Sequence, residues 1–148
     1  MRRTLAVALS AIALVLAMMS TPAQAETNAW QRSVFNRINY VRSGPLLPGD
    51  ACLDRYAENW AAVQASRLNR GRGYSHSSMI RLNRTCNGVW AGEIIGWGRW
   101  TTKSLVRAWL NSPPHRNILL TPRFRRMAVG SAPYKNGTVT VVNFIDRS

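Results

Sequence analysis

The sequence predicts a single α+β domain in which helices pack against a small antiparallel sheet. Two observations lead to this prediction. Up to about residue 120, apolar residues recur with the 3.6-residue period of amphipathic helices, and beyond it the period shortens to that of strands. The dipeptide Asn136-Gly137 then separates two alternating segments, as in a β-hairpin. Such a chain buries its sheet against helices in a layered sandwich.

The N-terminal segment has the organisation of a signal peptide. Arg2-Arg3 precede an apolar run from Leu5 to Met19, and Ala23-Gln24-Ala25 forms a small-residue cleavage site. The alternative is an uncleaved membrane anchor, for which the apolar run is short. We therefore expect residues 1–25 to be removed near Ala25. Residues 26–148 would form one domain, secreted from the cell or retained at its envelope.

The periodicity predicts the individual elements. Helices are expected at residues 28–41, 53–68, 101–111 and 113–120, with Asp50 or Asp54 capping the second and Thr101 or Thr102 the third. Strands are expected at residues 127–132 and 138–145, joined by a type I′ turn at Asn136-Gly137. In the second strand, one face is expected to carry Val139, Val141 and Asn143, and the other Val142 and Phe144. Residues 79–89 are interpreted as an irregular polar segment, and Gly92, Gly96 and Gly98 as turn formers.

The charge is strongly positive. The full chain carries a net charge of +14, and loss of Arg2 and Arg3 leaves +12. Such a field attracts anionic surfaces: acidic envelope polymers, lipid headgroups or nucleic acid. The arginines are scattered and no basic helix or aromatic-interleaved motif is present, so specific nucleic-acid binding is not expected. A genomic bias towards arginine codons would give a similar composition.

Cys52 and Cys86 are the two cysteines of the chain. In an exported protein they most simply form one disulfide, because the compartment is oxidising. Two buried free thiols are the alternative. A metal site is less favoured, since neither cysteine belongs to a C-x-x-C pair.

His115 follows the break at Pro113-Pro114. Ser112 can cap the helix that starts there, which places His115 in its first turn, where the positive end of the helix dipole favours a neutral imidazole. A neutral imidazole can bind a metal ion or accept a proton. The simpler alternative is a histidine that only packs at a corner.

His76 and Glu93 are further candidates. His76 lies in a small polar loop, where a solvated structural histidine is the alternative. Glu93 precedes Ile94 and Ile95, which suggests burial, and a buried carboxylate needs a cation or hydrogen-bond donor as partner. Arginine or protonated histidine would serve, and a Glu–Arg pair holding a loop is the structural alternative.

Taken together, several segments resemble the CAP superfamily, also called the SCP domain, and most closely its bacterial secreted branch. They are residues 35–42, Tyr74-Ser-His76, Gly92-Glu93, residues 109–119, Pro122-Arg-Phe124 and Asn143-Phe144. The resemblance implies an α-β-α sandwich with a central, mostly antiparallel sheet. It also implies a cleft to which His76, His115 and Glu93 contribute.

The sequence departs from the family pattern at three positions. The second family acid would fall at or near Ser112, Ile94 replaces an asparagine, and Ala128 replaces a glycine. The expected site is therefore reduced to His76, Glu93 and His115, with Ser112 and Trp109 as candidate ligand contacts. His76 and His115 make half a tetrahedral site, which water, Glu93 as a candidate third ligand, or a bound molecule would have to complete, so we expect weak binding of Zn²⁺ or another divalent cation.

The expected function is that of a monomeric, non-enzymatic binding module for a small or lipid-like ligand, acting at the envelope or outside the cell. A metal-assisted hydrolase, with Glu93 as general base, is the first alternative. The second is a cationic protein that binds anionic envelope polymers or membrane surfaces through its surface alone.

Overall fold

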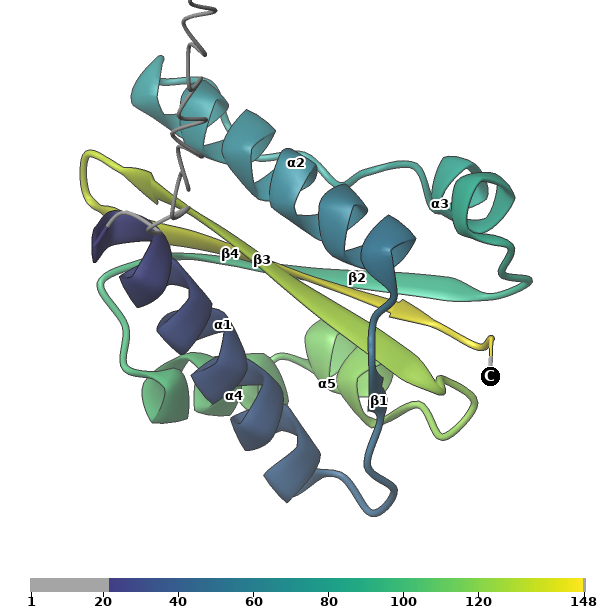
Figure 1. Ribbon diagram of the computed structural model, residues 1–148. Coiled ribbons are helices and arrows are strands. Elements are labelled where there is room, and N and C mark those ends of the chain that lie inside the picture. Colours follow the sequence, from purple (N-terminus) through teal and green to yellow (C-terminus); the bar gives the residue numbers. More distant parts are fainter. Residues whose placement is uncertain (1–21, 148) are drawn as a thin grey trace, which may run out of the picture.

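The computed structural model describes residues 22–147 (Figure 1). The elements, in chain order, are α1 (Pro22–Val41), β1 (Leu47–Pro48), α2 (Ala51–Asn69), α3 (Met79–Cys86), β2 (Ala91–Gly98), α4 (Thr102–Asn111), α5 (Pro113–Leu120), β3 (Arg126–Tyr134) and β4 (Gly137–Ile145). The predicted signal segment lies outside the described residues, except that its last four residues belong to α1.

The strands form one sheet in the order β1-β3-β4-β2. β4 pairs antiparallel with both β3 and β2, and the two-residue β1 pairs parallel with β3. α2 and α3 cover one face of the sheet, and α1, α4 and α5 cover the other (Figure 1). The predicted α-β-α sandwich with a mostly antiparallel sheet is confirmed.

The hydrophobic core is divided by the sheet. Val142 and Phe144 pack towards α1, α4 and α5, whereas Val139 and Val141 pack towards α2. This is the alternation that the period of two predicts. α2 lies so close to β3 that a Cβ added at Gly130 would overlap the backbone carbonyl of Ala57.

The starts of α2 and α4 agree with the expected capping residues. Asp50 caps α2 by accepting hydrogen bonds from the amides of Cys52 and Leu53, both at 3.0 Å. Thr101 caps α4 and forms a reciprocal capping box with Ser104. Within residues 22–147, no helix is both long enough and apolar enough to cross a membrane.

Residues 79–86 of the segment expected to be irregular form the helix α3, and only residues 87–89 are irregular. Ser78 caps it by accepting from the amide of Arg81, and Leu82 and Cys86 are buried one turn apart. With only two buried apolar positions in eight residues, the helical period is too short to stand out in the sequence. Packing against α2 therefore decides its conformation.

The interpretation of Gly92, Gly96 and Gly98 as turn formers is wrong, because all three belong to β2. A Cβ at Gly92 would come within 2.9 Å of Phe124 and Ile118 side-chain atoms, and a Cβ at Gly96 would lie 2.5 Å from Leu105. The first two glycines let side chains from the α4–α5 layer approach the strand closely.

The β3–β4 turn also differs from the prediction. Tyr134 pairs with Gly137, so the two turn residues are Lys135 and Asn136. Neither has a positive φ, which excludes the type I′ turn. Gly137 adopts φ 138° instead, where it lies against the backbone of Gly98 and Arg99.

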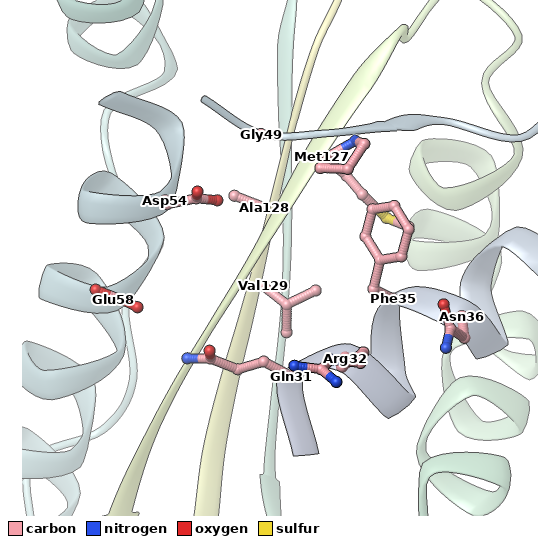
Figure 2. Close-up of a pocket in the computed structure, with 11 residues that line it drawn as sticks. Gln31, Arg32, Phe35, Asn36, Gly49, Asp54, Glu58, Met127, Ala128 and Val129 are labelled. Atoms are coloured by element: carbon pink, nitrogen blue, oxygen red, sulfur yellow. The ribbon is translucent and has the colours of Figure 1, made fainter. Parts of the chain in front are cut away.

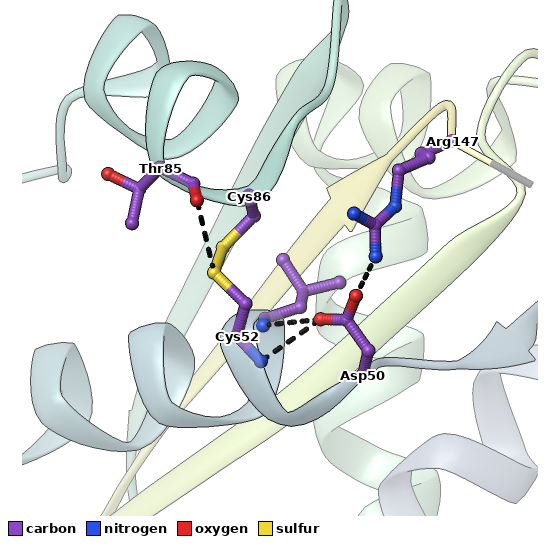
Figure 3. The surroundings of a disulfide bond; sticks show 6 residues. Asp50, Cys52, Thr85, Cys86 and Arg147 are labelled. Atoms are coloured by element: carbon purple, nitrogen blue, oxygen red, sulfur yellow. Dashed lines mark hydrogen bonds and ion pairs between the residues drawn. A yellow bond between two sulfur atoms is a disulfide. The ribbon is translucent and has the colours of Figure 1, made fainter.

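The predicted disulfide is present and joins the start of α2 to the end of α3 (Figure 3). The Cα atoms of Cys52 and Cys86 are 5.7 Å apart, at a sequence separation of 34 residues. The adjacent cap residue Asp50 also forms an ion pair with Arg147, next to the end of β4. This corner of the molecule thus fastens three distant segments together.

Replacing both cysteines by alanine should lower the free energy of unfolding by about 3–4 kcal/mol, because the cross-link restricts the unfolded chain. Urea denaturation followed by circular dichroism measures the change. The unmodified protein in reducing agent is the matched control and should lose a similar amount. An unchanged midpoint in both samples would contradict a stabilising role for the bridge.

Candidate functional site

Glu93 lies in β2 and is the buried centre of the candidate site. Its side chain is only 1% exposed and accepts four hydrogen bonds. The donors are the Ser77 amide at 2.9 Å, the Ser77 hydroxyl at 2.6 Å, His76 Nδ1 at 2.8 Å and Asn143 Nδ2 at 3.1 Å. Asn143 is its cross-strand partner in β4. These contacts meet the need for partners that burial of the carboxylate predicts.

The partners of Glu93 are not those of the Glu–Arg pair that the sequence left open as an alternative. No described arginine lies within ion-pair distance of Glu93, and His76 takes that place. The carboxylate does hold a loop, because His76 and Ser77 belong to the segment between α2 and α3. Ser77 and Asn143 were not predicted as partners of Glu93. The strand register, had it been known, would have identified Asn143.

Glu93 sets the orientation of the His76 ring. A carboxylate only accepts hydrogen bonds, so His76 Nδ1 carries the proton and donates a hydrogen bond to Glu93. In the neutral imidazole this leaves the lone pair on Nε2. The His76 side chain is 48% exposed, which makes that nitrogen available to a ligand or metal ion.

His115 occupies the first turn of α5, as predicted, but Ser112 does not play the capping role that was expected of it. Ser112 stands at the N-cap position without capping the backbone, and its hydroxyl lies 2.8 Å from His115 Nδ1. Burial lowers the pKa of His115, and the nearby charge of His76 lowers this pKa further. The ring is thus biased towards the neutral form through burial and its histidine neighbour.

The two histidines approach the open edge of β2 from opposite layers of the sandwich. β2 is an outer strand, His76 comes from the α2–α3 loop, and His115 comes from α5. His76 contacts Glu93 of β2, and His115 borders the same cavity as Ile95 and Trp97 of β2. The fold therefore brings together residues that are far apart in the sequence.

A cavity of about 240 Å³ adjoins His115. Both predicted ligand contacts, Ser112 and Trp109, line it, and Trp109 is fixed by a hydrogen bond from its Nε1 to the carbonyl of Ile95 at 3.2 Å. The remaining lining residues are Ile95, Gly96, Trp97, Trp100, Leu105 and Ala108. The cavity is therefore apolar, with polar groups at the Ser112–His115 end.

Exposed aromatic rings connect His76 to this cavity. Tyr74 lies edge-on to His76, with ring centroids 5.8 Å apart, and packs against Trp97 at 4.5 Å. Trp97 and Trp100 line the cavity, and Trp100 Nε1 donates to the Trp97 carbonyl. These three aromatics were not predicted as site residues. Their position depends on β2 being a strand, which the sequence interpretation missed.

The donor set of the described residues is too small for a structural metal site. His76 and His115 are the two candidate ligands, while both Glu93 oxygens already accept hydrogen bonds. Among the described side chains, no group of three or more His, Cys, Asp or Glu residues could hold a metal ion. Glu93 is placed to orient His76, in the manner of a carboxylate behind a metal-binding histidine.

Comparisons with known proteins bear on this arrangement. Residues 35–144 match the model of the CAP family, described as the cysteine-rich secretory protein family. The uncharacterized protein YkwD of Bacillus subtilis is 37% identical over 57 residues, which cover 38% of this chain. That match covers 21% of the relative, so the chain corresponds to a small part of it.

Two solved structures share the fold. An outer surface protein from Borrelia burgdorferi superposes with a TM-score of 0.65 at 22% identity, covering 82% of this chain and 96% of that one. An extracellular protein containing an SCP domain from Bacillus anthracis gives 0.62 at 21% identity, covering 87% and 45%. The family match spans most of the sandwich and includes both histidines and Glu93, so this chain belongs to the CAP family.

Proposed function

We propose that this protein is an exported, non-enzymatic binding module whose cleft at His76 and His115 takes a small or lipid-like ligand, together with a weakly bound divalent cation. The main support is the apolar cavity of about 240 Å³ that ends at His115 and Ser112. An open apolar groove with a few polar groups at one end suits a ligand with an apolar body and one polar group. A position outside the cytoplasm is supported by the signal-like N-terminus and by relatives described as outer surface or extracellular proteins.

The cation would be held by His76 and His115, completed by water or by the ligand itself. Bound there, it would supply a positive charge and a Lewis acid beside the polar end of the cavity. Glu93 orients His76 for this role, and Ser112 contacts the second imidazole. Two protein ligands account for weak rather than structural binding.

Calorimetric titration with Zn²⁺ tests the cation site. His76→Ala and His115→Ala should each abolish the binding heat, and Ser112→Ala should weaken binding about tenfold, because it removes only an orienting contact. Glu58→Gln, an exposed acid on α2 away from the cleft, is the control and should leave the titration unchanged. Unaltered Zn²⁺ binding in both histidine variants would refute the assignment.

Titration with decanoate, followed by tryptophan fluorescence, tests the cavity. Ala108→Phe should weaken binding about tenfold or more, roughly 1.4 kcal/mol or above, because the added ring fills the cavity. Ala62→Phe places the same ring at an exposed position on α2 and should have no effect. Equal loss in both variants would point to a general effect on the fold and against a ligand cavity at Ala108.

A metal-assisted hydrolase is the alternative that the same residues permit, with Glu93 as base. The four hydrogen bonds that fix Glu93 behind His76 favour the binding role. Turnover of a peptide and ester panel decides between them. Activity that disappears with chelator and in His115→Ala would support the hydrolase, and absence of turnover by the metal-loaded protein supports the binding module.

The strongly basic composition supports a contribution from the surface as well. If charge alone drives attachment to anionic surfaces, binding to phosphatidylglycerol vesicles should fall steeply between about 50 and 500 mM salt, because counterions screen the attraction. His76→Ala should bind these vesicles as the parent does. Vesicle sedimentation measures both, and salt-independent binding would contradict a purely electrostatic contribution.

A further inference from the structure

A second groove lies at the opposite edge of the sheet from the histidine cleft, between α1 and α2 (Figure 2). Its volume is about 440 Å³. Met127, Ala128 and Val129 of β3 form the floor, and Pro48 and Gly49 close one end. The groove therefore begins where β1 stops and follows β3 onward.

The edge of β3 in this groove has backbone groups free to pair. The amides of Leu47 and Gly49 donate to the carbonyls of Arg125 and Met127, at 2.9 and 2.8 Å, so these alternate carbonyls point outward. The strand continues in register with β4 to Tyr134. The two-residue alternation then turns the amide and carbonyl of Val129 outward too.

The short length of β1 leaves this edge incomplete. β1 ends at Pro48, because the chain turns at Gly49 and Asp50 into α2. Among residues 29–147, no backbone hydrogen bond joins Val129 to the segment that carries β1. An extended segment placed in the groove would continue the ladder that β1 begins, which is how peptides add to open sheet edges.

The side chains on the two sides of the groove indicate which residues such a segment would carry. The carboxylates of Asp54 and Glu58, one turn apart on α2, border the groove on one side (Figure 2). Each lacks an ion-pair partner among the described residues, in a chain with 20 basic residues. Burial raises the pKa of Asp54, and the neighbouring Glu58 raises it further, so a cation there would relieve the repulsion.

The α1 wall has a different character. Phe35 presents its ring towards Met127, and Arg32 lies further along the same helix (Figure 2). A second basic side chain would be repelled by Arg32 on this side. Because side chains alternate between the two faces of a strand, one residue in two would face the acids and the next would face Phe35.

We propose that the groove between α1 and α2 binds an extended peptide segment, which pairs with the outer edge of β3 and carries basic residues in alternation with apolar ones. The basic side chains lie against Asp54 and Glu58, and the apolar ones lie against Phe35 and Val129. This site is separate from the histidine cleft and does not depend on its function.

The test uses the peptide acetyl-Val-Lys-Val-Lys-Val-amide, with binding measured by calorimetry and by the shift of the Val129 amide signal in NMR spectra. The lysine peptide should bind, and a glutamate peptide of the same length should not. A lysine peptide with methylated backbone nitrogens keeps its side chains but cannot complete the ladder, so it should lose binding.

Protein variants locate the site. Glu58→Lys should weaken the lysine peptide about tenfold, since it exchanges attraction for repulsion at an exposed position. Asn59→Lys adds a positive charge on the next residue of α2, outside the groove, and should bind as the parent does. His76→Ala should also bind normally, which separates this result from any failure of the cleft. Circular dichroism confirms that each variant is folded.

Three results would overturn the proposal. They are equal binding of the lysine and glutamate peptides, full binding of the methylated peptide, and concentration-dependent self-association that Glu58→Lys abolishes. The last would identify a second copy of the chain as the occupant of this edge. Analytical ultracentrifugation of the protein without peptide detects it.

Discussion

The burial of one carboxylate organises the candidate site. Glu93 has almost no contact with solvent, so leaving any of its lone pairs without a donor would cost free energy. Its donors come from β4 and from the loop after α2, and satisfying them fixes that loop against the sheet. The same contacts determine which nitrogen of His76 faces outward. A structural requirement of the core thus sets the chemistry at the surface.

Much of the fold follows from periodicity, because amphipathic helices and alternating strands have to bury one face. The helices α1, α2, α4 and α5 and the β3–β4 hairpin were predicted for this reason, and so were the opposite faces of Val141 and Val142. α3 and β2 were missed. In α3 the apolar repeat is too short, and in β2 the glycines resemble turn signals although they accommodate side chains from α4 and α5.

The site was predictable only in part. The resemblance to the family indicated His76, Glu93 and His115, and the chemistry of a buried acid indicated that Glu93 has a partner. Neither indicated that Asn143 and Ser77 contact Glu93, because those contacts depend on strand register and on a loop conformation. The aromatic wall of Tyr74, Trp97 and Trp100 depends likewise on β2 forming the outer strand. The sequence did not predict which distant segments pair with one another.

The position of β4 has a consequence for the timing of folding. It is the central strand that joins β3 to β2, yet it is the last strand in the chain. The sheet and the hydrogen bonds of Glu93 are complete only when β4 pairs with both β2 and β3. Assembly therefore depends on contacts between distant parts of the sequence, which makes folding slow compared with a helical bundle of the same size.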